Sequence, residues 1–126
     1  MGRNKPARAR TGADRWKVAR GRWGERRAAT DYRRLGYGIL ATNWRGPDGE
    51  LDLIVRRDGV VVFSEVRTRR SDRYGPAAAA VTPSKQRTIR ALARTWLDEH
   101  QPVRSAVRFD VVAITGVHVE IIDAAF

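Results

Sequence analysis

Residues 50–67 read ELDLIVRRDGVVVFSEVR, and this stretch decides the fold. The dipeptide Asp58-Gly59 separates two runs that are rich in apolar and β-branched residues. That arrangement is the strongest short-range signal for a β-hairpin. Both faces of such a hairpin are apolar, which indicates strands that are covered on both sides. In the register of a two-residue turn, one face carries Leu51, Leu53, Val55, Val62 and Val66, and the other carries Ile54, Val61 and Phe63.

The same register brings two acids together. Residues that face each other across the hairpin have numbers that sum to a constant, so Glu65 lies opposite Asp52, and Arg67 opposite Glu50. Directly opposed side chains point to the same side of the sheet, where like charges are destabilising. A divalent cation is a natural compensation for such a pair. An ordinary ion pair between Glu50 and Arg67, or between Asp52 and another arginine, is the alternative reading.

Flanking segments place the hairpin within an α/β domain. We expect helices over residues 24–35 and 82–100, and further strands over 37–44, 106–114 and 117–122. Thr82 followed by Pro83 is a strong signature for the start of the second helix. This order of elements predicts a central mixed β-sheet flanked by helices.

The first helix carries one unusual acid. Ala28, Tyr32 and Leu35 recur at helical spacing and predict its buried face. Glu25 lies one turn earlier, on or beside that face. Its carboxylate either interacts favourably with the helix N-terminus or points inward at a shared site.

Composition excludes several classes of protein. The 126 residues suffice for one domain, contain no cysteine, and hold only two separated histidines, so disulfides and zinc sites are not expected. No apolar stretch approaches the roughly 20 residues that span a bilayer, and the N-terminus lacks a secretory signal. We therefore expect a cytoplasmic protein that does not bind membranes.

Positive charge is concentrated near the N-terminus. The net charge is +11, and residues 1–22 hold eight Lys and Arg against one acid. We expect residues 1–20 to form a basic, disordered arm and residues 21–126 to form the domain. The arm is either a solvated tail or a segment that contacts phosphates, and a polyanionic partner is favoured in both cases.

Oxygen ligands and a neighbouring arginine fit magnesium-dependent chemistry. Asp52 and Glu65 supply two carboxylates, and the backbone carbonyl of Val66 could add a third ligand to Mg²⁺ or Mn²⁺. The metal would polarise a phosphate oxygen and lower the pKa of a water. Arg67 presents a rigid fork that suits a phosphate and would neutralise developing charge.

Several separated blocks resemble the YraN family of bacterial proteins, in unbroken order over residues 21–126. The blocks are Gly24-Glu25, Asn43-Trp44, residues 49–54, residues 63–69, Tyr74-Gly75, residues 80–82 with Lys85-Gln86, and residues 108–112. That family resembles the restriction-endonuclease-like superfamily and is similar to Holliday-junction resolvases. The resemblance implies a central mixed sheet flanked by helices, a site that binds Mg²⁺, and DNA as the partner. By analogy with junction-resolving enzymes, it also implies a homodimer.

The resemblance also implies roles for individual residues. It makes Asp52 and Glu65 the metal-binding acids, Glu25 the helix-borne acid that completes the site, Gln86 a polar site residue on the later helix, and Glu50 an extra ligand. We expect the basic residues around these acids to contact the nucleic acid: Arg69, Arg70, Arg73, Lys85 and Arg87.

One departure from the superfamily pattern keeps two functions open. Arg67 stands where the superfamily has a catalytic lysine, and an arginine effectively cannot deprotonate. The first function is a Mg²⁺-dependent endonuclease that hydrolyses phosphodiesters, with branched or junction DNA among its substrates. The alternative is a nucleic-acid-binding module on a nuclease scaffold that does not turn over. A protein-interaction scaffold is a third class, because fold alone does not determine function.

Overall fold

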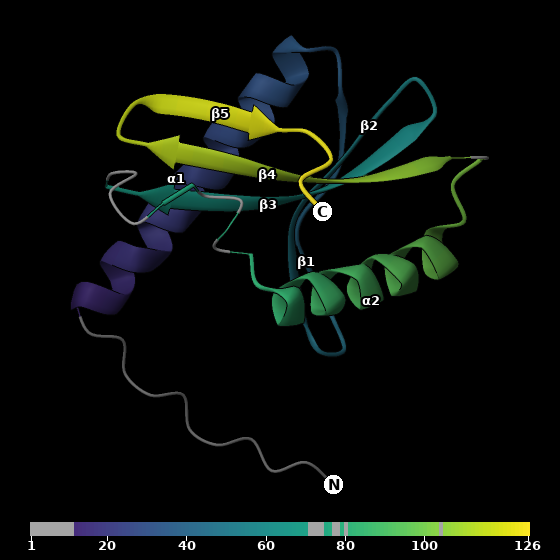
Figure 1. Ribbon diagram of the computed structural model, residues 1–126, viewed down its shortest axis with the longest axis horizontal. Coiled ribbons are helices and arrows are strands. Elements are labelled where there is room, and N and C mark those ends of the chain that lie inside the picture. The colour runs from purple at the N-terminus through teal and green to yellow at the C-terminus, as the bar shows by residue number, and fades with distance from the viewer. Residues whose placement is uncertain (1–11, 71–74, 77–78, 80, 104) are drawn as a thin grey trace, which may run out of the picture.

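A computed structural model describes residues 12–70, 75, 76, 79, 81–103 and 105–126. The chain forms a five-stranded mixed sheet with a helix on each face (Figure 1). The elements are α1 (Gly12–Arg34), β1 (Gly38–Gly46), β2 (Gly49–Arg57), β3 (Val60–Arg69), α2 (Pro83–His100), β4 (Ala106–Thr115) and β5 (His118–Ile122). This confirms the predicted α/β architecture.

Strands follow one another in chain order across the sheet, β1-β2-β3-β4-β5. Only β3 and β4 are parallel, because α2 forms the crossover between them; the other neighbours are antiparallel. The Asp58-Gly59 turn joins β2 to β3 in the predicted register, from Arg57–Val60 to Leu53–Ser64. The hairpin expectation is therefore confirmed along most of its length.

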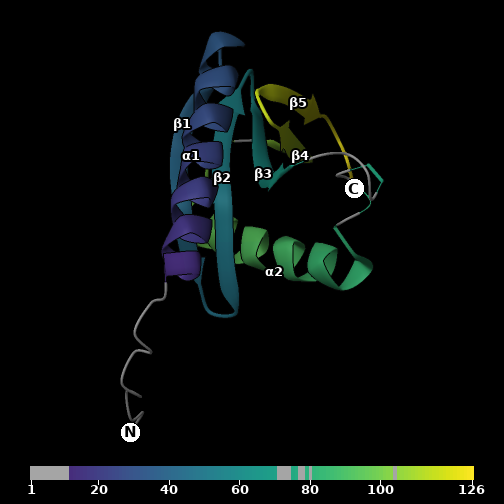
Figure 2. The ribbon, with the colours of Figure 1, turned by 90° about the vertical axis from the view of Figure 1, so that its left-hand side faces the viewer.

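Each helix covers its own apolar cluster. On one face, α1 buries Ala28 and Tyr32 against Leu53, Val55 and Val62 of the sheet. On the other face, α2 packs against Ile54, Phe63 and Phe109 through its buried stripe of Ile89, Leu92, Ala93 and Trp96. Figure 2 shows α1 running along β1 and β2, with α2 crossing on the opposite face. The sheet is thus covered on both sides, as its apolar strands predict.

Helix α2 begins and ends with the expected signals. Thr82 is its N-cap, and the Thr82 side chain accepts a hydrogen bond of 3.2 Å from the backbone N–H of Lys85. Pro83 follows in the first turn, where its missing N–H costs nothing. Gln101 closes the helix in the left-handed conformation, with its N–H bonded to the carbonyl of Leu97.

Three local predictions are wrong. Helix α1 begins at Gly12 rather than near Gly24, so residues 12–20 belong to a helix; residues 1–11 of the predicted arm lie outside the described residues. Leu35 follows the helix end and is 52% exposed instead of buried. Leu51 packs with the α2 cluster, not beside Leu53, because β2 bends toward α2 beyond the point where it leaves β3.

Neither helix of the described chain has the length and apolar character needed to cross a membrane.

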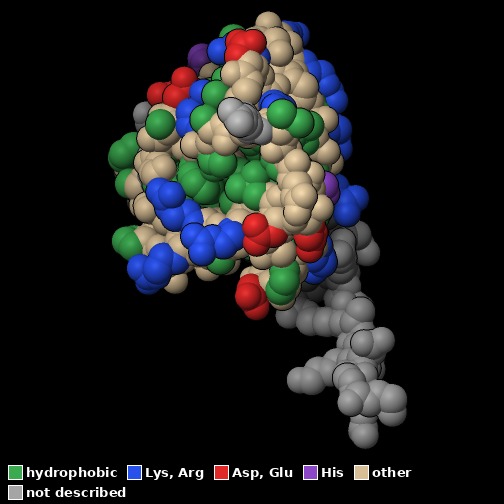
Figure 3. Space-filling view, turned by 90° about the vertical axis from the view of Figure 1, so that its right-hand side faces the viewer, with side chains coloured by type: hydrophobic (Ala, Val, Ile, Leu, Met, Phe, Trp, Pro, Cys, Tyr) green, Lys and Arg blue, Asp and Glu red, His purple; other side chains and the backbone are tan. Residues whose placement is uncertain are grey.

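Figure 3 shows one face of the molecule, where hydrophobic side chains gather in a hollow with basic side chains along its rim. A pocket of about 280 Å³ lies between α2 and β4, and Arg90 at its edge stacks over the ring of Phe109 at 4.6 Å.

Candidate metal centre

The site lies at a fork between β2 and β3. Pairing between these strands stops at Leu53–Ser64, one residue before the predicted Asp52–Glu65 pair. The backbone N–H of Val66 consequently has no carbonyl of β2 to bind. It donates instead to Oδ2 of Asp52, at 2.9 Å. The fork therefore opens the sheet and fixes the Asp52 carboxylate in the opening.

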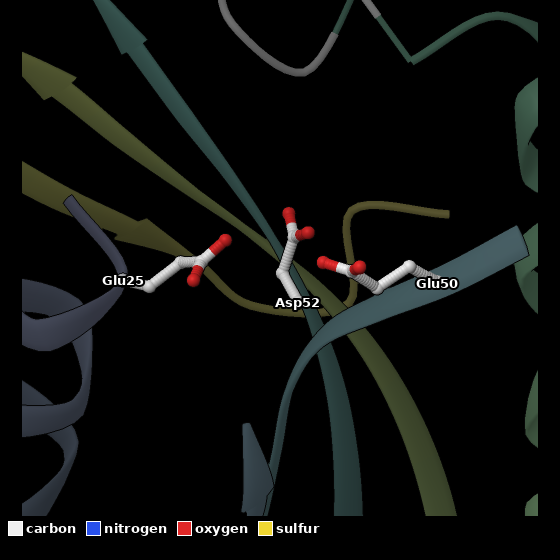
Figure 4. Close-up of side chains that lie close together, drawn as sticks. All are labelled: Glu25, Glu50 and Asp52. Atoms are coloured by element: carbon white, nitrogen blue, oxygen red, sulfur yellow. The ribbon is translucent and has the colours of Figure 1, made fainter. Parts of the chain in front are cut away.

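Three carboxylates meet in this opening. One ligand atom each from Glu25, Glu50 and Asp52 lies within 4.8 Å of the others (Figure 4). Glu25 comes from α1, and the other two come from β2. All three are half-buried. Glu25 thus points at the shared site, which was one of its two sequence-based readings.

The environment of Glu25 is unfavourable for a negative charge. Its Oε2 is buried and has no hydrogen-bond partner among the described residues. Burial raises the pKa of Glu25, and the nearby charges of Asp52 and Glu50 raise it further, against a hydrogen bond from Asn43. A buried, unpaired carboxylate oxygen is costly unless it is protonated or bound to a cation. Three carboxylates with an unpaired oxygen are a donor set that suits Mg²⁺ or Mn²⁺.

Glu65 joins the same site from the α2 side of the sheet. Its side chain is 8% exposed, and burial together with the charge of Asp52 raises its pKa to about 7. Two cations oppose this shift: Nζ of Lys85 lies 3.9 Å from Oε1 of Glu65, and Nη2 of Arg67 lies 3.6 Å from it. Asp52 therefore links Glu65 to the cluster of Glu25 and Glu50.

Most of the predicted site residues converge, with three qualifications. Glu50 pairs with Arg45 across β1 and β2, at 3.4 Å, and not with Arg67. Gln86 donates to the backbone carbonyl of Val81, so Lys85 rather than Gln86 is the α2 residue that contacts an acid of the site. Val66 contributes its N–H to Asp52. A ligand role for its carbonyl stays a prediction.

The predicted nucleic-acid contacts are spread over two regions. Arg69 donates to the carbonyl of Gly75, and Arg70 is exposed. Arg87 is exposed on α2, near Lys85. Arg73 lies outside the described residues. The roles of these side chains stay predictions.

Sequence reasoning missed a second polar network, on the α1 face. The buried carboxylate of Asp110 accepts from both Nε and Nη2 of Arg108, at 2.8 and 3.0 Å. The Tyr32 hydroxyl lies 2.8 Å from Asp110 Oδ2 and 2.9 Å from Ser64 Oγ. Ser64 therefore points away from Glu65, as expected, and is part of this network. The signal in the sequence was an acid inside an apolar strand, at Asp110.

Comparison with known proteins identifies the family. Residues 24–114 match the model of the uncharacterised protein family UPF0102. A UPF0102 protein of Frankia casuarinae is 49% identical over 117 residues, which is 89% of this chain and 99% of that protein. A UPF0102 protein of Frankia alni is 48% identical over 103 residues, covering 82% of this chain and 86% of that protein. One from Acidothermus cellulolyticus is 45% identical over 106 residues, covering 76% and 80%.

The family match spans the acids of the fork, from Glu25 to Glu65, the second half of α1 and the whole of α2. It also confirms the family that the sequence motifs indicate. The chain belongs to the UPF0102 family.

Proposed function

We propose that this protein is a Mg²⁺-dependent endonuclease that hydrolyses phosphodiester bonds in DNA. The observation that carries the proposal is the group formed by Glu25, Glu50 and Asp52, with its one unpaired, buried oxygen. Acids with a purely structural role in a chain with 25 Lys and Arg would be paired with those cations, as Glu50 is with Arg45. Glu25 and Asp52 have no ion pair with a described residue, and a shared cation accounts for their position beside Glu50.

In such a site, the acids would bind the metal and the basic residues would bind the phosphate. Asp52 is held by the Val66 N–H and lies between the other acids, so it would orient the metal together with Glu25 and Glu50. When bound, Mg²⁺ supplies Lewis-acid polarisation of a phosphate oxygen and acidifies a water. Arg67 and Lys85 flank Glu65 and would hold the phosphate and offset its developing charge.

Glu65 is suited to accept a proton near neutral pH. A pKa of about 7 places it close to the operating pH, where a general base is most effective. This role matters because Arg67 cannot take a proton. Glu65 would then act on the attacking water, directly or while sharing the metal with Asp52.

Cleavage assays on variants test the proposal. Purified protein with Mg²⁺ or Mn²⁺ should cut at least one of branched, flapped or linear DNA, and Asp52→Asn should lower the rate at least 100-fold. Asp98→Asn, an exposed acid on α2, is the matched control and should leave the rate unchanged. Cleavage that survives in both Asp52→Asn and Glu65→Ala would assign the activity to another centre.

Metal binding is measured separately by thermal unfolding. A cation that binds only the folded state stabilises it by about 2.7 kcal/mol at a hundredfold excess over its dissociation constant. Mg²⁺, Mn²⁺ and Ca²⁺ should therefore raise the melting temperature of the wild type but not of Asp52→Asn. Equal shifts in melting temperature in the two proteins would contradict a metal centre that includes Asp52.

Arg67 supports a second candidate, a nucleic-acid-binding module without turnover. Its guanidinium lies 3.6 Å from Glu65 and provides permanent positive charge at the site. This candidate predicts salt-sensitive DNA binding, no cleavage of any of these substrates with any of the metals, and weaker binding when residues 1–11, which precede α1, are deleted.

A further inference from the structure

We propose that the groove between α1 and β1 binds the phosphate backbone of a nucleic-acid strand and leads it to the acid cluster. The groove has a volume of about 750 Å³, and Glu25 and Glu50 form part of its wall. Helix α1 and strand β1 lie side by side along its length (Figure 2). This inference rests on the proposed function for the metal-binding role of the acids. The surface that it concerns differs from the predicted contacts around Arg69 and Arg87.

A stripe of arginines lines the helix side of the groove. Arg22, Arg26 and Arg33 line it and are exposed. Their spacing of four and seven residues puts them on one face of α1. At about 1.5 Å per residue the stripe extends roughly 16 Å. A duplex strand carries one phosphate per about 3.4 Å of axis, so the stripe faces roughly four or five phosphates.

These three arginines have no ion pair with a described residue, and the charge of Arg22 acts on nearby Glu25, whose pKa it lowers. Their neighbours on the next face of the same helix differ: Arg27 and Arg34 both pair with Asp31, at 3.6 and 3.7 Å. Positive charge on α1 is therefore neutralised within the protein on one face and left available on the face that lines the groove. Arg45 at the β1 side is paired with Glu50 at 3.4 Å, so the unpaired positive charge of the groove lies on its α1 side.

The other residues of the groove wall indicate contact with phosphates rather than bases. None of the described residues that line it is aromatic, so the stacking platforms used to bind unpaired bases are missing from this surface. Backbone contacts position a strand without reading its sequence. The groove thus fits a partner recognised by charge and shape.

Two double variants on one helix provide the test. Arg26→Ala/Arg33→Ala removes two groove arginines, and Arg27→Ala/Arg34→Ala removes two arginines one position along, with the same change in net charge. Both are made in Asp52→Asn protein without divalent metal, so that cleavage cannot affect binding. Binding of fluorescent 20-nucleotide DNA, single-stranded and duplex, is measured by anisotropy from 50 to 200 mM salt, after circular dichroism confirms folding.

The groove variant should bind about tenfold more weakly and show a smaller salt dependence. Each lost phosphate contact lowers the steepness of log K against log salt by about 0.9 for duplex DNA and by about 0.7 for single-stranded DNA. The change in slope therefore reports how many phosphate contacts the variant has lost with each kind of DNA. The Arg27/Arg34 variant should bind like its parent. Equal losses in both variants, losses in the control alone, no loss in either, or affinity that depends strongly on DNA sequence would each overturn the proposal.

This test separates the groove from the nuclease. If the groove variant loses affinity while the wild type cuts no DNA, the groove stands and the proposed activity fails. If the wild type cuts DNA but the groove variant binds as tightly as its Asp52→Asn parent, the groove fails and the activity stands.

Discussion

At the scale of single residues, the site is defined by how unfavourable its charges are without a cation. Glu65 is buried beside Asp52, and Glu25 has a buried oxygen with no partner. Both acids have a raised pKa, chiefly because burial makes their charged forms less favourable than in water. Carboxylates that only stabilise a fold show the opposite behaviour, because ion pairs lower their pKa.

The pKa of Glu65 leads to a prediction about stability and pH. Because its folded-state pKa of about 7 lies above the ordinary value of 4.5, folding favours the proton, and this stabilising contribution is lost as pH rises from 4.5 to 7. Glu65→Gln should therefore be more stable than the wild type at pH 8 in EDTA, by about 1–3 kcal/mol. Urea unfolding at pH 5 and pH 8 measures this. A variant less stable than the wild type at pH 8 would mean that the Lys85 and Arg67 pairs outweigh burial.

A second prediction concerns the effect of Lys85 on the titration of Glu65. Its charge lowers the pKa of Glu65, so Lys85→Met should move the carboxyl titration upward. Carbon NMR of the labelled Glu65 carboxyl measures the shift. Arg87→Met, two residues along α2 and exposed, is the control, and a titration that moves equally in both variants would deny Lys85 a specific role.

At the scale of elements, the site requires α1 to approach the sheet closely. Gly24 is buried where α1 passes β3, and a Cβ there would lie 2.3 Å from Oγ1 of Thr68. Glu25 is the next residue, so this close passage sets the distance between its carboxylate and the fork. A glycine inside a helix usually costs stability, and here it permits contact.

Substitution of Gly24 should therefore separate packing from helix propensity. Gly24→Ala should destabilise the protein by about 1–3 kcal/mol, because Val66 and Ile114 also confine the added methyl. The double variant Gly24→Ala/Thr68→Ala should recover most of the loss. Gly21→Ala, with no atom within 4 Å of its Cβ, should instead gain up to about 1 kcal/mol. Denaturant unfolding gives all three values, and a stable Gly24→Ala would show that the helix can shift.

The elements also show what sequence could and could not predict. Asp58-Gly59 and Thr82-Pro83 are local signals, and the hairpin register and the start of α2 follow from them directly. The fork does not, because no local motif marks where pairing between β2 and β3 ends. Beyond it, the tip of the β1–β2 hairpin packs against α2, where Gly46 lies close to Leu92 and Leu51 joins the α2 cluster.

The same limit applies within the site. The approach of Asp52 and Glu65 could be predicted from the strand register, although regular pairing ends just before them. The approach of Glu25 was one of two readings, because periodicity indicates a helix face but not its neighbour. Lys85 as the partner of Glu65 could not be predicted, since it depends on how α2 packs across the sheet.

At the scale of the whole molecule, the Asp110 network joins three distant parts of the chain. It connects Tyr32 of α1 and Arg108 of β4 with the C-terminal segment, where the N–H of Ala124 donates to Asp110 Oδ1 at 3.1 Å. Arg108 also donates to the hydroxyl of Tyr37 at 2.8 Å. The network lies on the face opposite Glu65, so it holds α1 against the sheet without contributing to the acid cluster.

Removal of this buried charge should destabilise the whole fold. Asp110→Asn leaves Arg108 without its main partner and should cost about 3–5 kcal/mol in the free energy of unfolding. Asp123→Asn is the control, because Asp123 is 68% exposed and lies 3.8 Å from the same arginine. Its cost should stay below about 1 kcal/mol. Thermal unfolding of both variants tests this, and similar melting temperatures would mean that the network does not support the fold.

The hydrogen bond from Val66 to Asp52 has a consequence for spectroscopy. This amide proton is bound to a carboxylate and not to a neighbouring strand, so its resonance frequency depends on the electron density of one oxygen, Oδ2. Any ion that withdraws density from Asp52 should move this single peak, while amides in the regular ladder, such as that of Val62, keep their positions. A nitrogen-labelled sample titrated with magnesium would therefore carry its own indicator of occupancy, with no added dye.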